Sequence, residues 1–185
     1  RQDGRRFKET DAKPILCQIL TGVAHLHRHG VAHLDLSLEN VFVEALTSCA
    51  KIGDFGVARR FIPGIAMENH LLRPKPGKPQ YMAPEVMQGF RFDGTKADIF
   101  CIGVLLFVML TGRYPFCDGY RAVDIRRHLH NYRHLAHVSA DLVDLLLSML
   151  EYEPDLRPSA EQALRHRCFG NRPSLLDDTS AGDMD

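Results

Sequence analysis

Apolar residues recur at three- and four-residue steps in several stretches of the chain, which is the spacing of one buried helix face. The first stretch predicts a helix over residues 10–29, with Thr10 or Asp11 as its cap and Pro14 in its first turn. Gly30 is the expected stop of this helix. The same pattern predicts further helices over residues 98–111, 122–130, 142–151 and 159–166. Gly112 is expected to end the first of these, and Ser159 is expected to cap the last.

Two short apolar runs have the character of strands rather than helices. Residues 41–43 and 49–52 are expected to pair as a small β-hairpin, with Asp54 directly after it. Residues 57–82 are rich in proline, glycine and basic side chains and show no period, which predicts a long irregular segment of functional importance. The fold class expected is therefore mainly α with a small β-hairpin.

The composition indicates which class of protein the chain belongs to. The chain has 185 residues, of which 45% are hydrophobic, and 23 basic residues balance 23 acidic ones. This predicts one globular domain over residues 1–170, with no overall charge that favours nucleic acid or an anionic membrane. The longest apolar run, residues 99–110, is too short to cross a bilayer and suits a core helix. Residues 171–185 are acidic and poor in large apolar residues, which predicts a disordered tail.

Five cysteines are scattered along the chain without a C-x-x-C pair, a usage typical of reduced thiols. We therefore expect an intracellular protein, cytoplasmic or nuclear. The chain does not begin with Met and shows no signal peptide, so residue 1 is expected to be a cut or an assigned boundary.

Three short motifs follow one another at close spacing. They are His-Leu-Asp-Leu-Ser-Leu-Glu-Asn at 33–40, Asp-Phe-Gly at 54–56 and Ala-Pro-Glu at 83–85. Together they resemble the catalytic loop, the metal-binding loop and the end of the activation segment of eukaryotic protein kinases. The resemblance extends from about residue 8 to about residue 169. It implies the large helical C-terminal lobe of the protein-kinase-like fold, which is α+β in the complete domain.

The resemblance also implies roles for individual side chains in phosphoryl transfer from ATP with Mg²⁺. Asp35 corresponds to the base that takes the proton of the acceptor hydroxyl. Asn40 and Asp54 correspond to the metal ligands, and a hairpin between them would bring both to one place. Glu39 and Tyr81 favour the serine/threonine branch of the family. The alternative is a set of unrelated polar residues in the loops of a helical protein.

Other positions match residues that support this site in the family. Glu85 is expected to pair with Arg157, and Asp98 to accept hydrogen bonds from the backbone of the 33–40 loop. Plain core packing is the alternative for the apolar members. The remaining matches are the His33–Phe55 stack with the neighbouring Gly56, and Phe42 with Leu105 and Met109 beneath the adenine.

Two departures concern activation. Leu34 replaces the arginine that receives the activation-loop phosphate in the family. Between Asp54 and Glu85 the chain has no Ser and no Thr, and Tyr81 is the one hydroxyl there. The arginine that receives the phosphate and the usual phosphorylation sites are both absent. We therefore expect activity that does not require phosphorylation of the activation loop.

Two further positions have exchanged side-chain types. Ser37 stands where serine/threonine kinases have a lysine that touches the γ-phosphate, and Lys78 stands where they have a threonine. We expect Lys78 to reach back to Asp35 and the γ-phosphate, with Ser37 as its partner. The alternative is a solvated lysine in a basic loop that also holds Arg73 and Lys75.

No glycine-rich loop and no Val-Ala-Ile-Lys strand precede these motifs. We therefore expect a protein serine/threonine kinase as the parent and little activity from this chain by itself. The alternative is a non-catalytic pseudokinase, or a lobe fragment that binds other proteins.

The ten histidines show no metal-binding spacing, which disfavours a helical metal protein. Sparse aromatic residues disfavour a nucleic-acid binder. The expected partners are protein substrates and ATP, with no nucleic acid and no membrane. A local basic patch offers a docking surface for acidic partners or a plain solvated face, and its main residues are Arg121, Arg126 and Arg127.

Overall fold

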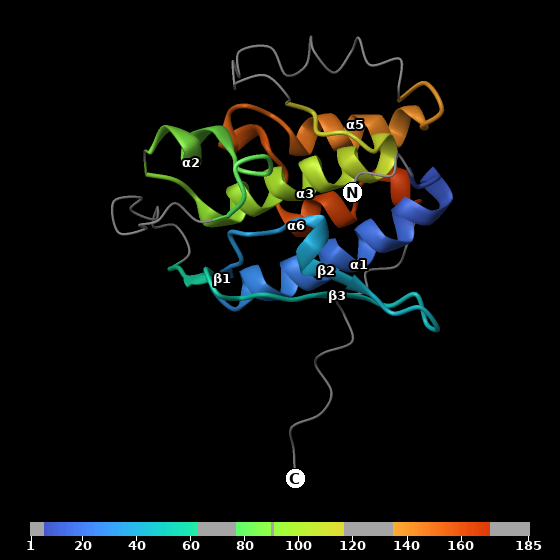
Figure 1. The fold of residues 1–185 in the computed structure, drawn as a ribbon. Helices are drawn as coiled ribbons and strands as arrows, with labels where there is room; N and C mark the ends of the chain where they lie inside the picture. Colours follow the sequence, from blue (N-terminus) through green and yellow to red (C-terminus); the bar gives the residue numbers. More distant parts are fainter. Residues whose placement is uncertain (1–5, 63–76, 90, 117–134, 171–185) are drawn as a thin grey trace.

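Helices and two pairs of antiparallel strands make up the fold, in a computed structural model that describes residues 6–62, 77–89, 91–116 and 135–170. The mainly helical class with a small hairpin is confirmed (Figure 1). The α-helices are α1 (Glu9–Arg28), α2 (Pro84–Gln88), α3 (Gly94–Thr111), α5 (Ala140–Met149) and α6 (Ala160–Leu164). The strands are β1 (Val31–Ala32), β2 (Val41–Val43), β3 (Ala50–Ile52) and β4 (Arg59–Arg60), and the short 3-10 helices are η1 (Leu38–Asn40), η5 (Pro154–Leu156) and η6 (Arg167–Phe169).

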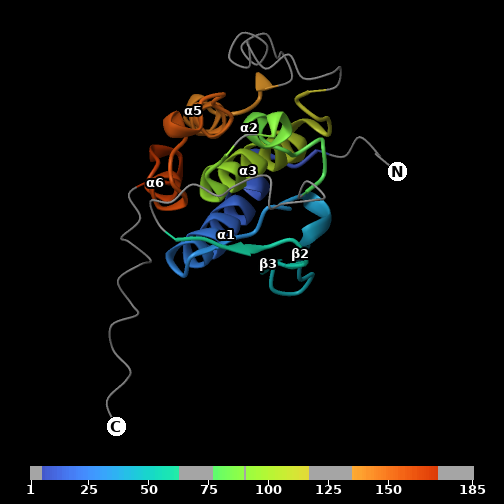
Figure 2. The same ribbon diagram turned by 90° about the vertical axis from the view of Figure 1, so that its left-hand side faces the viewer.

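Helix α3 lies at the centre, between α1 and α5, in both views of the ribbon (Figures 1 and 2). It begins four residues before the predicted start, because the Asp93 carboxylate accepts a 2.8 Å hydrogen bond from the Thr95 amide and caps the helix. Because the first turn of the helix is polar, the apolar pattern did not reveal this start. Gly112, at φ 70°, ends the helix as predicted.

Helix α3 is apolar because it lies in the core of the structure. By length and composition its 18 residues, with a mean hydropathy of 1.7, could cross a membrane. However, 83% of the helix is buried inside the structure, which is the burial of a core helix. The predicted core role is therefore the role that the structure gives it.

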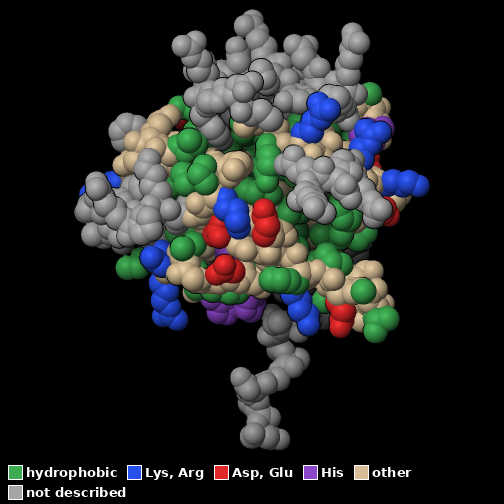
Figure 3. Space-filling model, in the orientation of Figure 1, with side chains coloured by type: hydrophobic (Ala, Val, Ile, Leu, Met, Phe, Trp, Pro, Cys, Tyr) green, Lys and Arg blue, Asp and Glu red, His purple; other side chains and the backbone are tan. Residues whose placement is uncertain are grey.

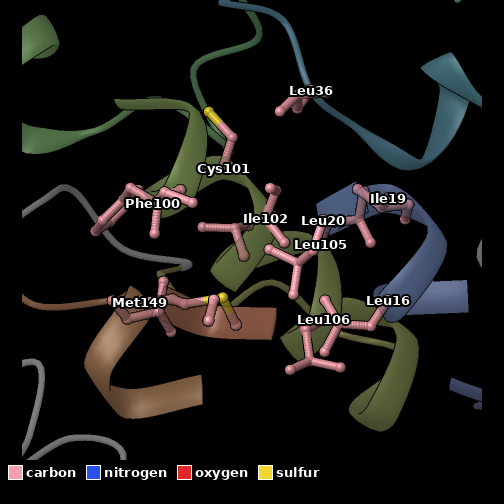
Figure 4. Packing of buried hydrophobic residues seen from close by; sticks show 14 of the residues in the cluster. Leu16, Ile19, Leu20, Leu36, Phe100, Cys101, Ile102, Leu105, Leu106 and Met149 are labelled. Carbon is pink, nitrogen blue, oxygen red and sulfur yellow. The ribbon is translucent and has the colours of Figure 1, made fainter. Parts of the chain in front are cut away.

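Side chains of α1 and α3 interlock in the core, as Figure 4 shows. Leu16, Ile19 and Leu20 of α1 are at most 1% exposed and face Leu105 and Leu106 of α3. Burial of each such side chain contributes about 1.5–3 kcal/mol relative to exposure. This packing makes α1 and α3 the rigid base on which the loops between them are held.

The ends of α5 and α6 follow local capping rules. Ser139 caps α5 by accepting a hydrogen bond from the Leu142 amide, so the helix begins at Ala140 rather than at the predicted residue 142. Ser159 caps α6 as predicted, in a reciprocal capping box with Gln162. Helix α6 ends at Leu164, two residues before its predicted end.

The sequence predicted one of the two strand pairs and not the other. Strands β2 and β3 form the predicted hairpin, in which Val41 pairs with Ile52 and Val43 with Ala50. Strands β1 and β4 pair Val31 with Arg60, and β4 lies inside the stretch 57–82 that was predicted to be irregular. Two residues are too few for a period, so this pairing became visible only in three dimensions. The irregular prediction is therefore wrong at β4.

The beginning of α1 is held by Glu9 rather than by the predicted caps Thr10 or Asp11. Lys8 occupies the cap position without a side-chain hydrogen bond, and Pro14 lies beyond the first turn. The Glu9 carboxylate accepts 2.7 Å hydrogen bonds from the amide and the hydroxyl of Ser139, the residue that caps α5. Burial raises the pKa of Glu9, but these bonds and the nearby charge of Lys13 outweigh it and lower the pKa.

Glu9→Gln is expected to lower the free energy of unfolding by about 1–2 kcal/mol near neutral pH, because Gln cannot accept both bonds. The lowered pKa makes the Glu9 contribution complete above its ordinary pKa of 4.5 and removes it as the pH falls through the folded-state pKa. Urea unfolding of both proteins should therefore converge in acid. A constant difference at every pH would contradict this, and the exposed Glu153→Gln should change nothing.

Some predictions fall outside the described residues. These are the helix over 122–130, the basic patch of Arg121, Arg126 and Arg127, the acidic tail over 171–185, and the part of the irregular segment over 63–76.

Candidate active site

The loop at 33–40 is fixed by one buried carboxylate. Asp98, fully buried on α3, accepts 2.8 Å hydrogen bonds from the backbone amides of His33 and Leu34. A third bond, 2.9 Å long, joins it to the His27 ring. Leu34 has φ 64°, a conformation that costs a non-glycine residue roughly 1–2 kcal/mol. The charge-assisted bonds from Asp98 offset this strain and set the direction of the residues that follow.

Asp35 and Asn40 face each other across this loop. The Asn40 amide nitrogen donates to the backbone oxygen of Asp35 at 2.7 Å and to its carboxylate Oδ2 at 2.9 Å. The other carboxylate oxygen, Oδ1, is buried and has no hydrogen-bond partner among the described residues. A buried acceptor without a protein donor is costly, which makes this atom a candidate to accept a hydrogen bond from a bound molecule.

Gly77 keeps the space next to this oxygen open. Its φ is +87°, and a Cβ atom added there would lie 2.6 Å from the Leu34 oxygen and 3.6 Å from Asp35 Oδ1. A side chain would therefore clash with the loop and crowd the acceptor atom. Both Asp35 and Gly77 line a cavity whose other walls are largely apolar, with Leu34, Leu36, Lys78, Tyr81, Met82, Ala83, Val86, Ala97 and Cys101.

The β2–β3 hairpin brings Asp54 to the same place. The Gly53 amide donates to the Asn40 backbone oxygen at 2.9 Å, and the Gly53 oxygen bonds the His33 ring at 3.0 Å. Asp54 follows directly, exposed and in a left-handed conformation with φ 60°. Its Oδ1 accepts a hydrogen bond from the Gly56 amide at 3.2 Å. Asn40 thus bonds the Asp35 side chain directly, and its backbone oxygen bonds Gly53, the residue before Asp54.

Aromatic residues border this cluster. The rings of His33 and Phe55 lie 4.9 Å apart with an interplanar angle of 60°, so the two residues are in ring contact but tilted rather than stacked face to face. Phe42 is 60% exposed and its ring covers Gly53, whereas Leu105 and Met109 are buried in the core. Phe42 and the 48% exposed Phe55 leave uncovered apolar surface beside the acidic residues.

Lys78 approaches the 33–40 loop from a separate segment. Its Nζ donates a 2.8 Å hydrogen bond to Ser37 Oγ and lies 3.7 Å from Asp35 Oδ2. A third oxygen, Glu39 Oε2, lies 3.9 Å away. On the face drawn in Figure 3, acidic and basic side chains gather near the centre, bordered by uncovered apolar groups.

A buried ion pair anchors the segment that carries Lys78. Arg157 makes a two-point contact with Glu85 of α2, with N–O distances of 2.7 and 2.9 Å. Its remaining donor bonds reach the backbone oxygens of Glu151, Lys96 and Tyr152, so all five N–H groups have an acceptor. The guanidinium also lies over the Phe100 ring at 4.8 Å.

Sequence reasoning missed three contributors to this site. Glu39 was assigned no contact with Lys78, and the need for glycine at position 77 was not seen. Tyr81 was assigned no contact with the 33–40 loop, yet its buried hydroxyl accepts a 3.4 Å bond from the Leu38 amide. Burial raises the pKa of Tyr81, so the phenol stays neutral. The only signal for these contacts was the sequence Gly-Lys-Pro-Gln-Tyr at 77–81, but the residues that it contacts lie about forty positions earlier, in the 33–40 loop.

No group of three or more His, Cys, Asp or Glu side chains arranged to hold a metal occurs within the described ranges. Binding of Mg²⁺ does not require such a group, because Mg²⁺ often takes one or two carboxylates and completes its shell with substrate phosphates and water.

Comparison with known proteins places the chain in a family. A family model described as "Protein kinase domain" matches residues 1–169. The chain is 35% identical to sperm motility kinase Z of Mus musculus over 89% of its length, covering 32% of that protein. It is 33% identical to CBL-interacting protein kinase 4 of Oryza sativa subsp. japonica (94% of the chain, 38% of the relative) and 34% identical to mitosis inducer protein kinase cdr2 of Schizosaccharomyces pombe (88% and 21%).

The chain thus spans between about a fifth and two fifths of the length of these relatives. The model match covers most of its residues, including every motif that builds the cluster around Asp35. This chain therefore belongs to the protein kinase domain family.

Proposed function

We propose that the chain is the helical C-terminal lobe of a serine/threonine protein kinase, which transfers the γ-phosphate of ATP to hydroxyl groups of proteins. The observation that supports this most directly is the buried Asp35 Oδ1, which lacks a donor among the described residues and borders a cavity. An acceptor hydroxyl would supply that donor. Asp35 then holds the hydroxyl and takes its proton as the oxygen attacks phosphorus.

The oxygen donors nearby fit Mg²⁺, which supplies charge neutralisation of the phosphates when bound. Asp54 offers an exposed carboxylate at the end of the hairpin. Asn40 uses its amide nitrogen for Asp35, which leaves its amide oxygen as the ligand atom. Phe42, exposed next to this pair, offers an apolar surface for the adenine.

The experiment is phosphate transfer by the full-length natural protein, with radiolabelled ATP, Mg²⁺ and a mixed protein substrate, followed by phosphoamino-acid analysis. Phosphoserine and phosphothreonine are the expected products. Phosphotyrosine alone would contradict the serine/threonine assignment. No incorporation, together with tight binding to another protein, would favour the non-catalytic alternative.

The same preparation tests activation. Leu34 is 5% exposed and packs in the core, and the hydroxyl of Tyr81 is engaged with Leu38. Neither residue offers a place to add or receive a phosphate. Activity should therefore persist after phosphatase treatment, and an activating phosphate mapped between residues 57 and 81 would contradict this.

A further inference from the structure

Lys78 has an unusual set of neighbours for a lysine at the surface. Its closest partner is a neutral hydroxyl, Ser37 Oγ, at 2.8 Å. The carboxylates of Asp35 and Glu39 lie at 3.7 and 3.9 Å, beyond hydrogen-bond distance. An ammonium group has three donors, and one is used in a short bond to a described residue. Its charge is thus shared between two long ion pairs, while its one short hydrogen bond goes to a neutral hydroxyl.

Ser37 is arranged to hold this lysine. It is fully buried and occupies the N-cap position of the short η1 helix, where a serine hydroxyl usually accepts a bond from the backbone. Here Ser37 makes no capping bond. Its hydroxyl is used by Lys78 instead, so the loop gives up a local bond to fix a cation from another segment.

The Lys78 ammonium group lies near only one of the two carboxylate oxygens of Asp35, the proposed base. Lys78 is near Asp35 Oδ2, whereas the buried Oδ1 is the atom left for the acceptor hydroxyl. In the transfer, the hydroxyl oxygen bonds to the γ-phosphorus as its proton passes to Asp35. The bond from that phosphorus to the β–γ bridging oxygen breaks, and its electrons leave with ADP. Negative charge on the moving phosphoryl group therefore passes close to the base.

We propose that Lys78, positioned by Ser37, is the cation that stabilises the phosphoryl group during transfer. This rests on the proposed kinase function and names a residue for it. A positive charge already held in place stabilises a charged transition state without reorganisation. Because Lys78 belongs to the 77–89 segment, full activity then requires this segment to be docked on the 33–40 loop.

The first test is the Lys78→Met variant of the full-length protein. Its kcat is expected to fall by roughly 10²–10³-fold, as when one charge-stabilising donor is removed from an active site. The KM for the protein substrate should change little, since a transition-state contact is lost. Lys13→Met is the matched control, because Lys13 is similarly exposed (32% against 35%) and has an ion pair far from the loop. A kcat within about threefold of the wild type would overturn the proposal.

An exchange variant separates charge from position. In the double variant Ser37→Lys with Lys78→Ser, position 37 carries the ammonium group and position 78 carries the hydroxyl. We expect it to regain at least about tenfold in kcat over Lys78→Met. A folded exchange variant no better than Lys78→Met would count against the proposal. If it does not fold, Lys78→Arg decides: it should exceed Lys78→Met by a similar factor, and equality would overturn the idea.

A third measurement does not depend on turnover. Acetylation of individual lysine amines can be followed by peptide mapping, with and without Mg²⁺ and a non-hydrolysable ATP analogue. The analogue should slow acetylation of Lys78 and leave Lys13 unaffected, and equal rates at Lys78 would oppose the proposal. A wild-type protein without transfer activity would refute the proposed function itself. An active wild type with an equally active Lys78→Met would refute only the role of Lys78.

Discussion

Replacing Asp35 with asparagine is expected to lower the kcat of phosphoryl transfer by about 10³-fold, the usual size of a lost general base. The change is nearly isosteric. The contact with the Asn40 amide can persist through an oxygen, whereas the atom at the Oδ1 position becomes a donor and can no longer accept the proton of the acceptor hydroxyl. Steady-state kinetics of the full-length protein give kcat, and thermal unfolding checks the fold.

Binding of Mg·ATP should survive this substitution, because the metal ligands proposed are Asn40 and Asp54. Ligand-induced thermal stabilisation measures that binding separately from turnover. Asp11→Asn serves as the control, since Asp11 is an exposed carboxylate on α1. An Asp35→Asn protein that turns over within about threefold of the wild type would show that Asp35 is not the base.

Arg157→Leu is expected to lower the free energy of unfolding by about 3–5 kcal/mol, as when one partner of a buried ion pair is removed. The Arg157 side chain is fully buried, and Glu85 is 12% exposed. Without the guanidinium, the Glu85 carboxylate and the backbone oxygens of Lys96, Glu151 and Tyr152 lose their donors. Urea unfolding followed by circular dichroism measures the difference.

An exposed ion pair provides the contrast for this prediction. Arg167 bonds Asp141 and Asp144 at 2.8 Å each, but its side chain is 65% exposed. Arg167→Leu should therefore change stability by less than about 1 kcal/mol. Adding Glu85→Leu to Arg157→Leu should recover part of the lost stability, because no carboxylate is then left unpaired. Equal costs for Arg157→Leu and Arg167→Leu would contradict the argument from burial.

Stability and activity are linked through this pair. Glu85 belongs to α2, in the same segment as Gly77 and Lys78, and Arg157 ties α2 to the backbone of residues 96, 151 and 152. Loosening the pair frees the segment that supplies the proposed cation. Arg157→Leu is thus expected to lower kcat as well, although Arg157 lies outside the reaction site.

Local features of this protein were readable from the sequence, because each depends on neighbours within one turn or one hairpin. The Ser159 cap, the Gly112 stop and the β2–β3 pairing belong to this group. So does the order of Asp35, Asn40 and Asp54, since a single hairpin joins the second to the third. The residue types and their order at these positions carried the resemblance to protein kinases.

Features that join distant segments were decided by the tertiary structure, except where the resemblance to kinases already implied them, as for Glu85 with Arg157 and Lys78 with Ser37. The pairing of β1 with β4 and the Glu9–Ser139 link have no periodic signal, because they involve two residues or one carboxylate. The Oδ1 of Asp35, which has no partner among the described residues, is buried only because the chain packs around it. Sequence by itself thus determined which chemical groups are present and in what order, whereas packing decided which of their atoms are paired and which remain available for reaction.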